Sequence, residues 1–348
     1  MDGTVVTAIG TPNIALVKYW GKRNSEINLP MNSSLSMTLN ETLNTTTSVL
    51  FSDDLKEDRM YINDELQNIR DSANEKSVFA ARALDHLRML AGAKSHALIV
   101  SRNSFPSSAG LASSASGAVT LVYAASNALG LKLPADELSI ITRQISGSAC
   151  RSAFGGFVAW HKGNADDGSD SCAECIAGKD YWPDVIDIIT LVSSAKKKIS
   201  SSEGHAITVK TSTLYKTRPP VAEERVNRMI TAIKERDFET LAIETIKDSN
   251  NMHATMLDSY PPIIYMNDTS KEIMMAIHEL NNDAGRMIAA YTFDAGANAH
   301  IITRINDKEQ VMEKLGSIVG NFIVAGQGDG PRLLGDNASL ISNEILSR

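Results

Sequence analysis

The sequence predicts an α+β protein of two domains. Its 348 residues are more than one ordinary hydrophobic core organises, so two domains are the better expectation. Segments with strand-like alternation are mixed with amphipathic helical segments, and antiparallel strands mixed with helices favour α+β over a doubly wound α/β fold. The predicted boundary near residue 185 gives an amino-terminal domain over 1–185 and a carboxy-terminal domain over 186–348.

The individual elements follow from local periodicity and from helix-stop signals. Residues 35–51 alternate apolar side chains with Thr, Ser and Asn, which predicts a pair of strands with one solvated face. Gly130 is the predicted end of a helix that begins near 112. The other elements expected in the first domain are helices at 77–91 and 135–145 and strands at 5–10, 97–101 and 154–161. The second domain is expected to contain strands at 187–193, 287–293 and 300–303 and helices near 221–235, 238–256 and 270–285.

Charge and composition exclude several classes of protein. The 43% hydrophobic and 22% charged content is typical of a globular chain. The net charge of -7, with no basic tail, argues against a nucleic-acid partner. We expect a cytoplasmic protein without a membrane partner, because the sequence shows no charged-then-apolar leader and no apolar stretch of bilayer length. Cys172 and Cys175 lack a second metal-binding pair, so we interpret the three cysteines as incidental.

The strongest local signal is a segment rich in serine, alanine and glycine between Asn103 and Gly117. Small residues let the backbone approach an anion, and the following helix presents unpaired N–H groups and a positive dipole end. The pattern is neither a Walker A motif nor a Gly-x-Gly-x-x-Gly motif. Tight packing of a small-residue helix start is the alternative, but the density of these residues favours a phosphate-binding loop. Its predicted binding residues are Ser107, Ser108, Gly110, Leu111, Ala112, Ser113, Ser114 and Ser116.

Two further segments carry candidate charged residues. The segment 146–152 sets serines beside Arg151, whose guanidinium can bind a phosphate or a carboxylate bidentately. A surface arginine at a helix–loop turn explains that segment equally well. Lys18 follows an apolar run in which a solvated lysine is unexpected, so it should pair with an acid, for which Asp294 is the candidate. Taken alone, Asp294 before its glycine turn is better explained as a turn cap.

These segments together closely resemble the diphosphomevalonate decarboxylase family of the GHMP small-molecule kinase superfamily. The resemblance runs from about Ala8 to Ile302. Its motifs occur in the same order at 13–23, 29–36, 105–117, 146–160, 200–201, 258–270 and 291–299. The Lys18-Tyr-Trp-Gly-Lys22 and Ser146-Gly-Ser-Ala-Cys-Arg151 segments are similar to the decarboxylase branch rather than to the sister kinases.

The resemblance implies a GHMP-kinase fold, in which a ribosomal-S5-like amino-terminal domain packs on an α+β carboxy-terminal domain with the active site between them. It implies ATP and Mg²⁺ as cofactors and, by analogy, a homodimer; it assigns no metal-ligating side chain. The implied catalytic residues are Asp294, Lys18 and Arg151. The implied substrate-binding residues are Tyr19, Lys22, Ser146, Ser148, Arg151 and Ser201.

The implied activity is decarboxylation of a phosphorylated mevalonate in isoprenoid biosynthesis, with loss of the 3-phosphate and CO₂ to give isopentenyl diphosphate or isopentenyl phosphate. We expect Asp294 to orient or deprotonate the tertiary 3-hydroxyl while Lys18 neutralises charge on the moving phosphoryl group. Arg151 should then hold the carboxylate in line as CO₂ leaves.

Several positions depart from the family pattern. The family usually carries Arg or Thr near 202–203 and Met near 205, where this chain has Ser202, Glu203 and His205; Ser104 and Ala297 also differ. An acid at this place would repel a diphosphate. Two archaeal-type alternatives that need one distal phosphate therefore stay open: an ATP-dependent phosphomevalonate decarboxylase and an ATP-independent mevalonate 3,5-bisphosphate decarboxylase. A GHMP kinase that stops after phosphorylation and a non-catalytic ligand-binding relative are further alternatives.

Overall fold

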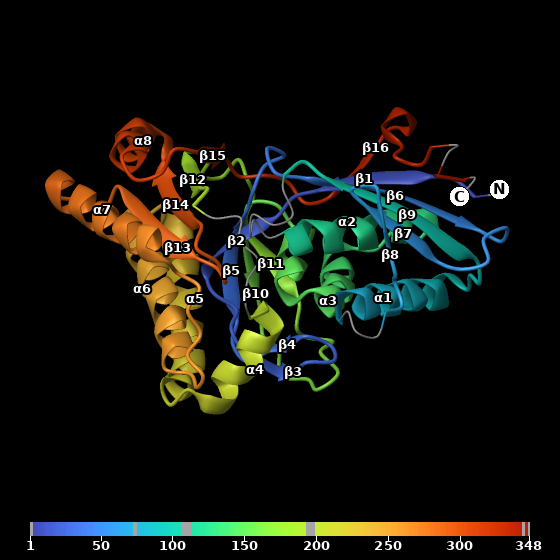
Figure 1. Cartoon of the computed structure of the whole chain (residues 1–348), viewed down its shortest axis with the longest axis horizontal. Coiled ribbons are helices and arrows are strands. Elements are labelled where there is room, and N and C mark those ends of the chain that lie inside the picture. Colours follow the sequence, from blue (N-terminus) through green and yellow to red (C-terminus); the bar gives the residue numbers. More distant parts are fainter. Residues whose placement is uncertain (1–2, 72–74, 106–112, 193–198, 343–344, 347–348) are drawn as a thin grey trace.

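Figure 1 shows a computed structural model of the chain, in which a middle sheet lies between an amino-terminal and a carboxy-terminal layer of strands and helices. The structure describes residues 3–71, 75–105, 113–192, 199–342 and 345–346. Helices and antiparallel strands are mixed throughout these residues, which confirms the predicted α+β class.

The amino-terminal layer is a six-stranded sheet covered on one face by three helices. The strand order is β16 (Arg332–Leu334), β1 (Val6–Gly10), β6 (Thr45–Ser52), β9 (His96–Asn103), β7 (Arg59–Ile62) and β8 (Glu65–Gln67). The helices are α1 (Glu75–Ala91), α2 (Ser113–Ala128) and α3 (Ala135–Ile145), and they pack on one side of the sheet (Figure 1). Alanines and branched apolar residues fill the core between them.

The middle sheet has the order β11 (Ala173–Ala177), β10 (Phe157–Trp160), β5 (Ser34–Thr38) and β2 (Asn13–Val17). Every residue of β2, β5 and β10 is buried. A short hairpin of β3 (Lys22–Asn24) and β4 (Leu29–Pro30) follows β2, and the 3₁₀ helix η1 (Gly147–Ala153) precedes β10. The ends of these elements carry most of the predicted catalytic and substrate-binding residues.

The carboxy-terminal layer contains a sheet with the order β13 (Ala289–Phe293), β14 (Ala299–Arg304), β12 (Val185–Thr190) and β15 (Phe322–Ala325). Its helices are α4 (Ser201–Thr211), α5 (Arg218–Glu235), α6 (Phe238–Leu257), α7 (Asp268–Ala284) and α8 (Lys308–Gly316). Helix α6 contacts both β2 of the middle sheet and β13 of this sheet. One hydrophobic core therefore runs from Ile14 and Leu35 through Met229 to Tyr291, and it docks the two halves of the chain.

The predicted helices and most predicted strands are present, but the interpretation of residues 35–51 was wrong. They form two strands, β5 and β6, which lie in different sheets and are almost entirely buried. The hydroxyl groups that suggested a solvated face bond to other strands instead. Thr7 bonds to Ser48, and Thr47 bonds to Ser101. Alternation of polarity therefore reflected cross-strand hydrogen bonding rather than exposure to water.

The end of the chain returns to the amino-terminal sheet. Strand β16 pairs with β1, and Leu340 and Ile341 pack against the same sheet. The division into 1–185 and 186–348 stays a prediction. Strand β16 and residues 340–341 belong to the second range but lie on the amino-terminal sheet. The returning segment crosses the paired ends of β5 and β10: Gly328 donates to the carbonyl of Thr38, and its own carbonyl accepts from Gly156.

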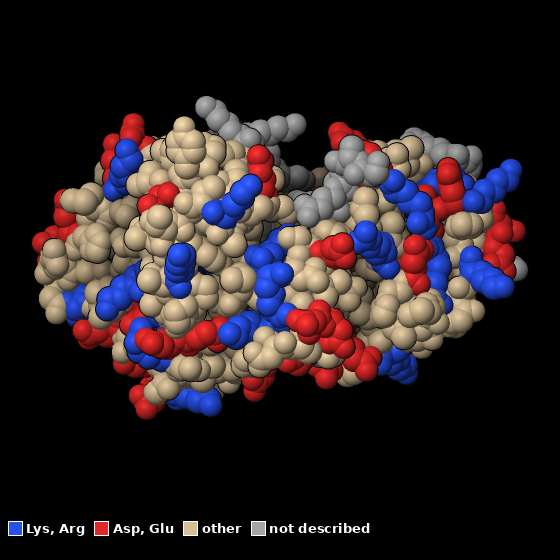
Figure 2. All heavy atoms as spheres, turned by 90° about the horizontal axis from the view of Figure 1, so that it is seen from below, with Lys and Arg blue, Asp and Glu red and all other residues tan. Residues whose placement is uncertain are grey.

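On the face shown in Figure 2, Lys and Arg side chains are interspersed with Asp and Glu rather than gathered into one patch. In the part of the chain that the structure describes, no helix is long and apolar enough to span a bilayer. All three cysteines are free thiols.

We predict that Gly328→Ala lowers the melting temperature, because a Cβ at this position would lie 2.2 Å from the carbonyl oxygen of Leu39. Backbone must shift to relieve that contact, at a cost of about 1–3 kcal/mol. Gly335→Ala is the matched control, since nothing lies within 4 Å of its Cβ and its φ is -68°. Thermal unfolding followed by circular dichroism should show a lower midpoint for Gly328→Ala alone; equal midpoints would contradict the close packing of this crossing.

Candidate active site

The centre of the candidate site is an ion pair between the two halves of the chain. Lys18 follows β2, Asp294 follows β13, and Lys18 Nζ lies 2.6 Å from Asp294 Oδ1. The lysine side chain is 2% exposed and the aspartate side chain 37% exposed. Burial lowers the pKa of Lys18, while the neighbouring Asp294 and Asp248 raise it. The predicted pairing is thus confirmed, and the aspartate is the partner that faces outward.

Arg151 is a buried cation beside this pair. It lies in η1, its Nε donates to Asn13 Oδ1 at 3.1 Å, and its Nη1 donates to Ser34 Oγ at 2.6 Å. Its guanidinium carbon lies 6.0 Å from the ring centre of Trp160. Because these partners are neutral, burial lowers the pKa of Arg151 more than its surroundings restore it. A buried guanidinium held by neutral groups is suited to bind an anion.

Tyr19 packs on the turn that carries Ser146 and Ser148. A Cβ on Gly147 would lie 2.8 Å from Tyr19 Cε1, so only glycine admits the tyrosine ring at this distance. Asn13 fixes the same turn, since its Nδ2 donates to the carbonyl of Ser148 at 3.1 Å. Asn13 is a polar residue at the start of an apolar strand, and this signal could have indicated its role in orienting Arg151, which the sequence analysis missed.

Lys22 and Ser201 come together where α4 meets the turn after β2. Lys22 Nζ donates to Ser202 Oγ at 3.1 Å, and Ser201 is the first residue of α4. His205 holds the two elements together, because its Nδ1 accepts the N–H of Gly21 at 2.7 Å. Its ring stacks on Trp20 with centroids 4.2 Å apart. Burial lowers the pKa of His205 well below the usual range, so the ring is neutral.

The predicted phosphate-binding loop is described only in part. Ser107, Ser108, Gly110, Leu111 and Ala112 lie outside the described residues. Helix α2 begins at Ser113 as predicted. Ser114 is half-buried, whereas Ser116 is buried with its Oγ 2.7 Å from Thr45 Oγ1, in the packing of α2 on β6. The nucleotide-binding role of this loop stays a prediction.

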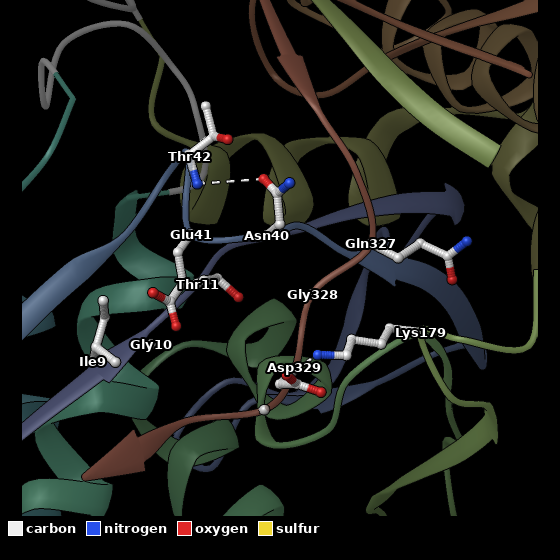
Figure 3. A pocket seen from close by; sticks show the side chains of 11 residues that line it. Ile9, Gly10, Thr11, Asn40, Glu41, Thr42, Lys179, Gln327, Gly328 and Asp329 are labelled. Atoms are coloured by element: carbon white, nitrogen blue, oxygen red, sulfur yellow. Dashed lines mark hydrogen bonds and ion pairs between the residues drawn. The ribbon is translucent and has the colours of Figure 1, made fainter. Parts of the chain in front are cut away.

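A pocket of about 340 Å³ lies where the chain crosses between its halves (Figure 3). An ion pair between Lys179 and Asp329 joins the two crossing segments at its edge. The lining residues are Ile9, Gly10, Thr11, Asn40, Glu41, Thr42, Lys179, Gln327, Gly328, Asp329 and Gly330. None of the predicted site residues is among them, so the pocket is distinct from the cluster around Lys18.

His253 on α6 supports β13, the strand that precedes Asp294. Its Nε2 donates to the carbonyl of Phe293, the residue before Asp294, at 3.3 Å. The side chain is buried, and burial lowers its pKa to about 4. His253 is therefore a structural residue of α6.

Comparison with known proteins points to one family over both halves of the chain. Residues 10–173 match the diphosphomevalonate decarboxylase-like N-terminal domain, and residues 187–332 match the mevalonate 5-diphosphate decarboxylase C-terminal domain. Diphosphomevalonate decarboxylase mvd1 of Aspergillus fumigatus is 45% identical over 92% of this chain and 82% of its own length. Diphosphomevalonate decarboxylase of Saccharomyces cerevisiae is 47% identical over 85% of this chain and 77% of its own length.

Solved structures agree with these matches. A structure of MDDEF in complex with MVAPP, AMPPCP and magnesium superimposes with a TM-score of 0.85 at 35% identity. The match covers 95% of this chain and 98% of that chain.

We predict that the neutral state of His253 makes the protein sensitive to acid. The folded-state pKa is about 4, against 6.5 for an ordinary histidine, so the unfolded chain binds more protons between these values. The contribution of neutral His253 to the free energy of unfolding should therefore be fully present above pH 6.5 and be lost as the pH falls toward 4. His253→Gln removes the titrating group, and the wild type should lose about 2 kcal/mol more than this variant between pH 7.5 and 5.

Urea unfolding at both pH values measures that difference. His161→Gln is the control, because the His161 side chain is 45% exposed and lies away from α6. The same pH dependence in His253→Gln and wild type would contradict the prediction.

Proposed function

Because this chain belongs to the diphosphomevalonate decarboxylase family, we propose that its substrate is mevalonate 5-diphosphate, which it phosphorylates with ATP and then decarboxylates. Decarboxylation of a phosphorylated mevalonate, a carboxy-lyase reaction of isoprenoid biosynthesis, follows from the family itself. The GHMP-kinase fold expected from the resemblance is confirmed by the structural match. The names of the relatives support the 5-diphosphate, and the bound AMPPCP and magnesium of MDDEF support the nucleotide and the metal ion.

The archaeal-type interpretation is not supported, because the similar relatives include fungal and mammalian diphosphomevalonate decarboxylases. It depended on repulsion of a diphosphate by Glu203. That side chain is exposed at the first turn of α4, where water and salt screen its charge. A homodimer and a cytoplasmic location stay predictions.

The observation that carries the proposal is the asymmetric burial of Lys18 and Asp294. The carboxylate is exposed enough to meet a hydroxyl group, while the ammonium stays behind it. We propose that Asp294 accepts the proton of the 3-hydroxyl group. The hydroxyl oxygen then bonds to the γ-phosphorus of ATP, and ADP leaves. Lys18 offsets the negative charge that gathers at the transferred phosphoryl group.

Arg151 serves the second step. The bond between C3 and the phosphate oxygen breaks with both electrons leaving on phosphate. The carboxylate carbon then departs as CO₂, and the electrons of its bond form the alkene. A carboxylate held by the Arg151 guanidinium stays aligned with the breaking C3–O bond. Because Arg151 is anchored by Asn13 and Ser34, it meets the substrate already oriented.

The distal phosphates fit the junction of α4 with the turn after β2. Lys22 supplies a cation there, and the start of α4 at Ser201 supplies a positive helix end. Tyr19, which follows β2, packs on the neighbouring turn that carries Ser146 and Ser148 and leads to Arg151 in η1. This arrangement supports an elongated substrate with its phosphates at α4 and its carboxylate at η1.

The residues also fit a nucleotide with its magnesium ion. Within the described residues no group of three or more metal-ligating side chains is found, and Mg²⁺ bound mainly through phosphate oxygens needs none. The serine hydroxyls predicted at and before the start of α2 are the groups that would hold the nucleotide and, through its phosphates, the ion. When bound, the ion neutralises charge on the phosphates.

The substrate is tested by presenting the protein with mevalonate 5-diphosphate, 5-phosphate and 3,5-bisphosphate, each with and without ATP and Mg²⁺. We expect CO₂ release from the 5-diphosphate only when ATP is present, with one ADP for each CO₂. ADP without CO₂ would identify a kinase instead. CO₂ from the bisphosphate without ATP would reject the proposed substrate.

We predict that Asp294→Asn lowers kcat for CO₂ release by at least about 100-fold, because the amide keeps the size but cannot accept the proton. ADP formation should fall equally, since phosphorylation comes first. Asp329→Asn is the control, because its side chain is exposed and pairs with Lys179 at the crossing. A turnover near wild type in Asp294→Asn would remove the aspartate from the mechanism.

A further inference from the structure

Helix α6 connects the two strands that carry the catalytic ion pair. It lies against β2, which ends at Val17 before Lys18, and against β13, which ends at Phe293 before Asp294. Polar side chains on one face of this helix bond to both strand ends. None of these side chains was selected by the sequence as part of the site.

On the side of α6 that faces β2, the buried Asp248 is hydrogen-bonded to the backbone of Lys18. Its Oδ2 accepts the N–H of Lys18 at 2.6 Å. Arg218 from α5 binds the other backbone group: its Nη2 donates to the carbonyl of Lys18 at 2.8 Å and to Asp248 Oδ2 at 3.1 Å. Asp248 and Arg218 are both fully buried. Both backbone polar groups of one residue are thus held by a single buried ion pair.

On the side of α6 that faces β13, Ser249 and His253 are hydrogen-bonded to the backbone of Phe293. Ser249 Oγ accepts the N–H of Phe293 at 3.1 Å, and His253 Nε2 donates to its carbonyl at 3.3 Å. Asp294 follows Phe293 directly. The two sets of hydrogen bonds from α6 therefore fix the backbone at Lys18 and next to Asp294. A shift of α6 would move both together.

The charge of Asp248 also acts on Lys18. The charged and titratable groups around the lysine are Asp294 after β13, Asp248 and His253 on α6, Arg218 on α5 and Arg151 in η1. Burial lowers the pKa of Lys18, Arg151 lowers it further, and the two aspartates raise it. Loss of the Asp248 charge would therefore lower the pKa of Lys18.

We propose that Asp248 is a positioning residue for the reaction, which fixes the backbone of Lys18 and places negative charge behind its ammonium group. The proposal rests on the decarboxylase function proposed above. A buried ion pair is by itself poor support for stability, because desolvation cancels much of the attraction. The bonds of Asp248 and Arg218 to Lys18 give the pair a role that apolar residues of equal volume could not fill.

The test compares Asp248→Asn with Glu244→Gln. The first variant keeps an oxygen for the Lys18 N–H but removes the charge. Glu244 is the matched control, since it lies one turn earlier on α6, is buried, and pairs with Arg225 as Asp248 does, but the structure gives it no bond to Lys18. Both variants lose a buried acid from the same arginine cluster, so a merely structural effect should be similar in the two.

Two readouts are expected to separate the variants. In Asp248→Asn, the alkaline limb of kcat/KM should move about one unit to lower pH, because the Lys18 ammonium loses its proton earlier. NMR titration of labelled lysine side chains, with the Lys18 signal assigned through Lys18→Arg, should show the same shift without substrate. Glu244→Gln should keep the wild-type limb and titration. An unshifted Lys18 titration in Asp248→Asn, or an equal shift in both variants, would overturn the proposal.

The two proposals fail in different ways. Wild-type protein that releases no CO₂ from any phosphorylated mevalonate rejects the function, while the NMR titration still decides the role of Asp248. If Asp248→Asn does not fold, Arg218→Lys provides the test: it keeps a positive charge but cannot serve Asp248 and the Lys18 carbonyl at once. We expect at least a tenfold lower kcat with an unmoved alkaline limb; wild-type kcat would overturn the proposal.

Discussion

The ion pair between Lys18 and Asp294 is the constraint on which the rest of the site depends. Its partners directly follow strands in different halves of the chain, so the pair forms only when the halves are docked. The continuous apolar core across the middle sheet supplies the docking energy, and the pair then offsets part of the cost of burying an ammonium group. Packing and chemistry are therefore coupled at one contact.

The strand β2 and the turn after it organise the other charged groups. Asn13 at its start orients Arg151, and Gly21 in its turn bonds to His205 of α4. Gly21 has a φ of 92°, which brings Lys22 to the start of α4 without the strain that a side chain would add. The ten residues from Asn13 to Lys22 thus contribute to the carboxylate, phosphoryl and distal-phosphate parts of the proposed substrate site.

The sequence could predict Lys18 and Asp294 because a lysine within an apolar run requires an acid, and the family resemblance supplied its position. It could not predict Asp248, Asn13 or His205, whose partners lie 230, 138 and 184 residues away. Hydrogen bonds over such separations depend on how sheets and helices dock, which local periodicity does not encode. The same limit explains residues 35–51: alternation indicated two strands but not that they belong to different sheets.

His205 shows why a departure from a family pattern is a weak indication of a changed substrate. As a sequence difference beside Glu203, it suggested a site altered toward fewer phosphates. In the fold, its imidazole bonds to the Gly21 backbone and stacks on Trp20, so it fills an apolar space and fixes a turn rather than carrying a charge. Lys22, which follows that turn, is bonded to Ser202 of α4. The cation proposed to bind a distal phosphate is thus retained although the surrounding residues differ.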